Sequence, residues 1–75
     1  MAQLPVVKPN QVIKALQRAG FIIVRQTGSH IRLIHQTESH RRVSIPFHNK
    51  DLKRGTLKSI LRQANLSIEE FIKLF

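Results

Sequence analysis

The sequence contains no cysteine, which excludes a disulfide framework and the zinc sites that are built on thiolate ligands. It also lacks a long apolar stretch: the longest run is Phe21 to Val24, far short of the roughly 20 apolar residues that span a membrane. The first twenty residues contain no apolar run followed by a cleavage site, so no secretory signal is visible. We therefore expect a cytoplasmic protein that does not enter a membrane.

Acidic residues are scarce. Four Asp and Glu stand against thirteen Lys and Arg, for a net charge of +9, and the segment from Lys8 to Lys50 contains only one acid, Glu38. A surface that serves solubility alone normally mixes both signs of charge. Because a strong positive field attracts and steers polyanions, this composition favours a nucleic acid as the partner. A membrane-surface helix fits less well, since the charge is not confined to one helix face.

The length of the chain limits its architecture. Seventy-five residues suffice for one domain, because a second core would leave two halves too small to fold unaided. The apolar content of 41%, with four Phe and neither Trp nor Tyr, is enough for one layer of packing. We therefore expect a single domain over residues 1–75.

Apolar residues recur at three- and four-residue spacing in Asn10–Gly20 and in Thr56–Asn65, which predicts an amphipathic helix in each segment. A short helix is expected near the C-terminus. Residues that suit helix ends flank all three: Pro9 and Gly20 for the first, Thr56 as N-cap and Asn65 as stop for the second, and a Ser67–Glu70 capping box for the third.

Three strands are expected between the two long helices. Phe21–Gln26 is rich in β-branched residues, whereas His30–His35 and Arg42–Pro46 alternate apolar and polar residues. Thr27–Ser29 is expected to be the turn of the first hairpin, with Gly28 supplying positive φ. The predicted fold class is therefore α+β: a two-layer sandwich with a three-stranded antiparallel sheet, helices on one face and α-β-β-β-α order.

The alternation assigns side chains to the two faces of the sheet. If the apolar residues of the second and third strands meet the helices, then His30, Arg32, Arg42 and Ser44 point to the open face. Phe21–Gln26 is apolar on both faces, so the pattern leaves open which of them meets the helices.

Two kinds of site are poorly supported. His30, His35 and His40 are evenly spaced, but an odd spacing in a strand puts neighbours on opposite faces, and no carboxylate cluster accompanies them. We therefore expect no metal and no other cofactor. A catalytic triad would need Ser29, His30 and an orienting acid to converge, and nothing in the sequence ties Asp51 to His30.

RNA cleavage requires less of the protein, because the ribose 2′-hydroxyl serves as the nucleophile. An imidazole, with a reference pKa of about 6.5, can act as base or acid near neutral pH, and Lys or Arg can stabilise the charge on the phosphate. His30 and Arg32 on one open basic face supply these groups. On composition alone, however, a lone exposed histidine is inert more often than not.

Four stretches resemble one known family: "ALQRAGFIIVRQTGSH", "GSH" itself at the start of the second strand, "RRVSIPFH", and "LKRGTLKSILRQANLSIEEF". Over about Val12 to Phe75 the chain resembles the HicA (YcfA-like) toxin family of mRNA interferases. The resemblance implies a fold similar to a double-stranded-RNA-binding domain and activity as a ribosome-independent mRNA endonuclease. It also implies a type II toxin–antitoxin system, in which a HicB-type antitoxin protein holds the toxin inactive.

The resemblance also implies a catalytic residue. The essential histidine of the family follows Gly-Ser, which places it at His30; many members have a second histidine directly after it, where this chain has Ile31. The residues expected to bind RNA lie beside His30 or at the start of the second long helix, where helix N–H groups would add to the side chains: Ser29, Arg32, Lys53, Arg54 and Lys58. The alternative for the basic residues is a solvated face.

The remaining histidines differ in their expected roles. His48 and Asn49 lie in a loop that could reach the substrate, whereas His35 and His40 are expected to be inert. The sequence therefore predicts a metal-independent mRNA endonuclease that uses His30 as acid and base. The alternative is a non-catalytic RNA-binding module of the same fold. A DNA-binding helix-turn-helix is disfavoured, because the loop 47–55 is too long for one.

Overall fold

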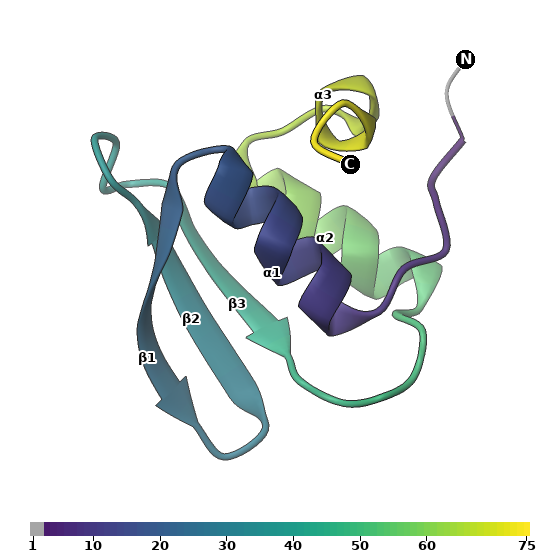
Figure 1. Cartoon of the computed structure of the whole chain (residues 1–75), viewed down its shortest axis with the longest axis horizontal. Helices are drawn as coiled ribbons and strands as arrows, with labels where there is room; N and C mark the ends of the chain where they lie inside the picture. Colours follow the sequence, from purple (N-terminus) through teal and green to yellow (C-terminus); the bar gives the residue numbers. More distant parts are fainter. Residues whose placement is uncertain (1–2) are drawn as a thin grey trace.

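The computed structural model describes residues 3–75, which form three helices and a three-stranded sheet (Figure 1). In chain order the elements are α1 (Pro9–Arg18), β1 (Phe21–Thr27), β2 (His30–His35), β3 (Arg42–Pro46), α2 (Arg54–Ala64) and α3 (Ile68–Ile72). The α+β class and the α-β-β-β-α order are confirmed, with α3 as the short C-terminal helix. The arrangement agrees with the expected likeness to a double-stranded-RNA-binding domain.

The sheet is an antiparallel meander in the order β1-β2-β3. Thr27 pairs with His30, so only Gly28 and Ser29 form the turn of the first hairpin. The expected turn over Thr27–Ser29 is wrong by one residue, because Thr27 belongs to β1. A two-residue hairpin turn requires positive φ, which Gly28 provides at +55°.

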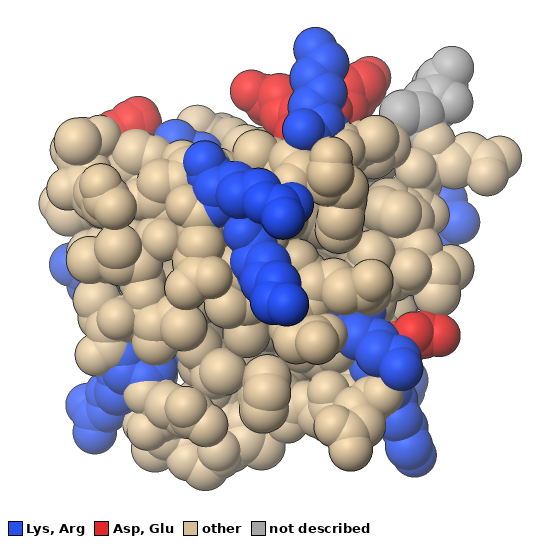
Figure 2. All heavy atoms as spheres, viewed as in Figure 1, with Lys and Arg blue, Asp and Glu red and all other residues tan. Residues whose placement is uncertain are grey.

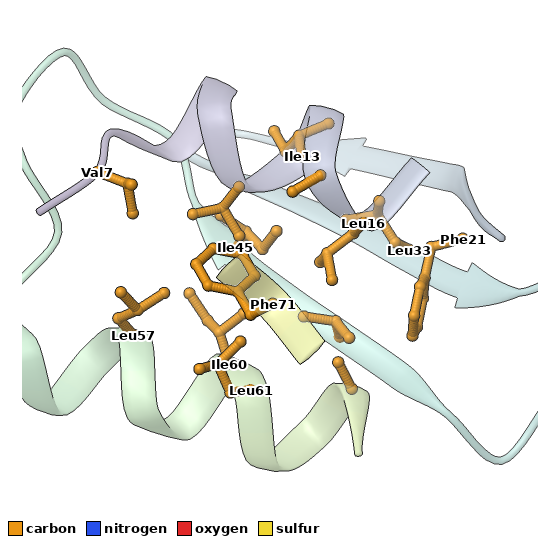
Figure 3. Packing of buried hydrophobic residues seen from close by; sticks show 14 of the residues in the cluster. Val7, Ile13, Leu16, Phe21, Leu33, Ile45, Leu57, Ile60, Leu61 and Phe71 are labelled. Atoms are coloured by element: carbon orange, nitrogen blue, oxygen red, sulfur yellow. The ribbon is translucent and has the colours of Figure 1, made fainter. Parts of the chain in front are cut away.

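One apolar cluster joins the sheet to the helices (Figure 3). Alternate residues of β2 and β3 point into it, while α1 and α2 close it from the other side; Leu57, Ile60 and Leu61 of α2 lie close to Ile45 and Phe71 in Figure 3. Full burial of each large apolar side chain stabilises the fold by about 1.5–3 kcal/mol. All the buried residues of β2 and β3 lie on one face, so the expected covering of one face by helices is confirmed.

The helix ends follow the expected residues in most places. Pro9 occupies the first turn of α1, Asn65 ends α2 in the left-handed conformation with φ 58°, and the Ser67 and Glu70 side chains form the capping box of α3. The expected N-cap at Thr56 is wrong: α2 begins at Arg54, and Thr56 lies within its first turn. Its N-cap, Lys53, makes no side-chain capping bond, so the sequence carried no capping signal there.

β1 is the edge strand on the side away from α2 (Figure 1). Only its first residue, Phe21, is buried. Ile22, Ile23 and Val24 are 42%, 45% and 56% exposed, although Ile23 pairs with Leu33 on the helix-covered face. The helices therefore cover β2 and β3 more fully than β1, which is why its apolar pattern did not identify a buried face.

Gly20 and Gly55 provide a matched test of this geometry. Gly20 has φ +100°, and a Cβ there would lie 3.0 Å from Nε2 of His35, whereas a Cβ at Gly55, within α2, would meet nothing within 4 Å. We expect Gly20→Ala to lower the free energy of unfolding by about 1–3 kcal/mol and Gly55→Ala to raise it by up to about 1 kcal/mol. Urea titration of both variants measures the two changes, and equal effects would contradict the assignment of Gly20.

Candidate nucleic-acid interface on the open face of the sheet

The face of the sheet that the helices leave uncovered, called here the open face, presents side chains in three cross-strand rows. Strand pairing defines which residues share a row. From the hairpin turn outward the rows are Thr27–His30–Pro46, Arg25–Arg32–Ser44 and Ile22–Ile34–Arg42. The expected placement of His30, Arg32, Arg42 and Ser44 on this face is confirmed.

His30 stands at the start of β2, directly after the hairpin turn, and its side chain is exposed. The backbone around it is held on both sides: Thr27 pairs with His30, and the Phe47 N–H donates a 2.6 Å hydrogen bond to the carbonyl of Ser29. None of the side-chain hydrogen bonds within residues 3–75 uses the His30 ring. The backbone that carries the imidazole is therefore held in place, while no hydrogen bond from residues 3–75 occupies either ring nitrogen.

A hollow of about 380 Å³ adjoins His30 and is lined by Arg25, Thr27, His30 and Arg32. It is called here the histidine hollow. The structure thus brings together two residues expected at the site, His30 and Arg32, and adds a second arginine, Arg25, that the sequence did not indicate.

Arg25 lies on the open face although Ile23, two residues before it, lies on the covered face, because β1 contains a bulge between them. Ile23 pairs with Leu33 on the covered face and Arg25 pairs with Arg32 on the open face, so Val24 is an extra residue between them. In a regular strand, residues 23 and 25 would share a face. The extra residue reverses the alternation. The combination of a two-residue turn with a bulge carries no recognisable signal in this sequence, which is why Arg25 was missed.

A second hollow, of about 490 Å³, lies next to the first and shares Arg25 and Arg32 with it. Its other lining residues are Val24, Leu33, Ile34, Arg42, Ser44 and Gln63. Gln63 belongs to α2, and its Oε1 accepts a 3.0 Å hydrogen bond from the N–H of Ser44. The C-terminal half of α2 therefore closes the β3 side of this second hollow.

The basic residues at the start of α2 lie elsewhere. Lys53, Arg54 and Lys58 are exposed, and none of them lines the histidine hollow. Lys53 lines a separate hollow of about 320 Å³, together with His48 from the loop before α2; Nδ1 of His48 accepts a 3.1 Å hydrogen bond from the N–H of Lys50. Contact of these residues, and of Ser29 in the exposed hairpin turn, with RNA stays a prediction.

His35 contributes to the fold. Its Nδ1 accepts hydrogen bonds from the N–H groups of Thr37 and Glu38 at 3.3 and 3.2 Å, and its Nε2 lies 3.2 Å from the carbonyl oxygen of Ala19. The ring also packs edge-on against Phe21, with 5.2 Å between centroids. His35 therefore ties the end of β2 to the end of α1.

The electrostatic surroundings of the open face are positive. The four acids lie outside the strands, at Glu38, Asp51, Glu69 and Glu70. Figure 2 shows several Lys and Arg side chains on the face in view, with Asp and Glu near its margin. Within residues 3–75 the one ion pair is Arg41–Glu38, at 3.4 Å, so the arginines of the open face have no carboxylate partner there. Among residues 3–75, no three His, Asp or Glu side chains are placed to hold a metal ion, and no helix is long and apolar enough to cross a membrane.

Comparison with known families gives this geometry a context. The family model described as the HicA toxin of bacterial toxin–antitoxin systems matches residues 9–66. The chain belongs to the HicA toxin family. The match spans α1, the whole sheet and α2, and so includes both hollows of the open face. A search of curated proteins found no match.

Membership in the HicA family makes the chain the toxin of a toxin–antitoxin system, which implies an antitoxin partner. It confirms the family that the motifs indicated in the sequence.

The contrast between His30 and His35 predicts unequal effects of their replacement on stability. We expect His30→Ala to change the free energy of unfolding by less than about 0.5 kcal/mol, as for exposed positions without bonds. His35→Ala should lower it by about 1–2 kcal/mol, because it removes an acceptor from two N–H groups and a partner from Ala19. Denaturant unfolding of both variants provides the measurement. A large loss for His30→Ala would show that His30 serves the fold.

Proposed function

We propose that this HicA-family toxin is a metal-independent mRNA endonuclease in which His30 acts as acid and base. The observation that carries the proposal is the position of His30: an exposed imidazole with no protein hydrogen-bond partner among residues 3–75, in a hollow with two arginines, on a face without carboxylates. A ring without protein partners is free to exchange protons with a substrate.

The chemistry needs few groups. His30 removes the proton from a ribose 2′-hydroxyl, whose oxygen attacks the adjacent phosphorus. The imidazolium formed in this way gives the proton to the 5′-oxygen of the next nucleotide, which leaves as a hydroxyl group. The products are a 2′,3′-cyclic phosphate and a 5′-hydroxyl. Arg32 stabilises the negative charge that accumulates on the phosphate oxygens. Because the nucleophile is the 2′-hydroxyl of the RNA itself, the reaction does not require a metal ion to activate a water molecule.

The rest of the RNA is held by contacts that carry no sequence information. Ser29 lies next to His30 in the exposed turn, and Lys53, Arg54 and Lys58 surround the N-terminus of α2, where free N–H groups favour phosphate. We assign these residues to the RNA backbone. The alternative function is a non-catalytic RNA-binding module, in which the same residues bind RNA and His30 only contacts it.

The antitoxin partner is proposed to be a HicB-type protein that covers His30 and presents acidic residues to the toxin. The net charge of +9 favours such a partner, because complementary charges raise the association rate toward ~10⁸ M⁻¹s⁻¹ at low salt. A partner over the open face excludes RNA by occupying the same surface.

Cleavage by the purified protein tests the activity. We expect a single-stranded RNA to be cut by the wild type with the same rate in buffer and in excess EDTA, and His30→Ala to lose at least about a hundredfold in rate, as is typical when an acid–base group is removed. His40→Ala, which changes another exposed histidine, is the control and should keep the rate. Loss of cleavage in EDTA that a divalent ion restores would contradict the mechanism, and equal rates for wild type and His30→Ala would remove His30 from it.

Competition tests the partner. We expect His30→Ala to bind the HicB-type antitoxin nearly as tightly as the wild type, because surrounding residues supply most of the contact area. A titration of that complex with an uncleavable RNA should displace the antitoxin. Simultaneous binding of RNA and antitoxin, without mutual weakening, would show that inhibition works without covering the open face.

A further inference from the structure

The pairing of Arg25 with Arg32 is the feature of the open face that its fold does not explain. The two residues lie directly opposite each other on β1 and β2, and like charges in that position destabilise a sheet. No ion pair within residues 3–75 involves either of them. A pair of unneutralised arginines in a cross-strand position is therefore a cost to the fold that an anionic ligand would remove.

We propose that Arg25 and Arg32 form a clamp for one RNA phosphate, called here the arginine clamp, and that the two-residue turn and the bulge at Val24 together create it. This inference rests on the proposed function, because it takes RNA as the ligand. It adds a phosphate-binding residue, Arg25, and a position for the phosphate relative to His30.

The orientation of Arg25 supports the clamp. Nε of Arg25 donates a 3.1 Å hydrogen bond to Oγ1 of Thr27, and Thr27 pairs with His30. This bond turns the guanidinium along the strand toward the row that carries His30 and leaves its terminal NH₂ groups free. Guanidinium groups bind phosphate oxygens through two parallel N–H bonds, so two arginines can hold both non-bridging oxygens of one phosphate.

The two hollows support a nucleotide chain on both sides of that phosphate. The arginine clamp lines the histidine hollow on one side and the larger hollow on the other. One neighbouring nucleotide would lie beside His30, and the other over Val24 and Ile34, with the Gln63 amide at the far edge. An acidic protein segment also supplies anions, but RNA is favoured because the clamp shares its hollow with the one free imidazole on this face.

Four variants separate the clamp from general electrostatics. Arg25→Gln removes the charge and keeps a polar side chain of similar reach, and Arg25→Lys keeps the charge without the planar fork. Thr27→Val removes the hydroxyl that orients Arg25 and keeps a β-branched residue in the strand. Lys14→Ala removes one charge from an exposed position on α1 and serves as the control.

Two measurements are made on each variant. The first is the single-turnover cleavage rate of a short single-stranded RNA. The second is the affinity for the same RNA with 2′-O-methyl riboses, which cannot be cleaved, as a function of salt concentration. Urea unfolding verifies the fold, and Arg25→Gln should be at least as stable as the wild type, because it relieves the repulsion with Arg32.

We expect Arg25→Gln to lower the cleavage rate by about tenfold to a hundredfold, which corresponds to the loss of a charge-assisted hydrogen bond. The magnitude of its salt slope should fall by about 0.7. Thr27→Val should lower the rate and leave the salt slope unchanged, since no charge is removed. Arg25→Lys should retain the slope and lose part of the rate, and Lys14→Ala should retain the rate.

The site of the contact is tested by an RNA with one neutral methylphosphonate at the phosphate next to the cleavage site. In that RNA, Arg25→Gln should cause little further loss of affinity, whereas Lys53→Ala should weaken binding as it does with the unmodified RNA. Equal behaviour of Arg25→Gln and Lys14→Ala in rate and affinity would overturn the clamp while leaving the endonuclease proposal intact. The same holds if Arg25→Gln weakens only the binding of the antitoxin. If the wild type cleaves no RNA but the affinity results hold, the endonuclease proposal fails and the clamp stands as an RNA-binding site.

Discussion

The burial of alternate residues in β2 and β3 is the constraint on which the rest of this structure depends. Because Ile31, Leu33, Val43 and Ile45 must meet the helices, the residues between them are committed to the open face. A slip of the register by one residue would expose the core and bury charge. The same apolar residues that hold the fold together therefore also decide where His30 and Arg32 point.

A domain of 75 residues has a small apolar core, and its charged side chains lie outside that core. The carboxylates lie outside the strands, and two of them, Glu38 and Glu70, brace local structure. The backbone N–H of Ser67 donates to Oε1 of Glu70 at 2.8 Å and holds the pKa of that carboxyl below its ordinary value. The arginines of the open face are left without such partners. This separation of charge leaves the open face positive.

The two histidines at the ends of β2 show how position along one strand decides whether an imidazole is bonded within the fold or left free. His35 lies where the strand meets the end of α1, so backbone groups occupy both ring nitrogens. His30 lies at the hairpin turn, where backbone contacts hold the main chain and leave the ring free. Both residues are histidines at the end of one amphipathic strand, and the neighbouring elements occupy the ring nitrogens of one and leave those of the other free.

Local patterns in the sequence determined a large part of this protein. Helical periodicity located α1 and α2, Gly28 indicated the hairpin turn, Asn65 and the Ser67–Glu70 box indicated helix ends, and strand alternation assigned His30 and Arg32 to the open face. Each of these features depends on residues within a few positions of one another. The N-cap of α2 escaped prediction because Lys53 holds that position through backbone geometry alone.

Only the tertiary structure decided the rest of the site. Whether Arg25 faces the core or the open face depends on the pairing of β1 with β2, and a bulge at Val24 with a two-residue turn reverses the face that simple alternation assigns. Exposure of Ile22 and Ile23 likewise depends on how far the helices extend over β1. The separation of Lys53 and Arg54 from the histidine hollow depends on the path of the loop before α2. These are relations between segments distant in sequence, and the register between two strands is not encoded in either strand alone.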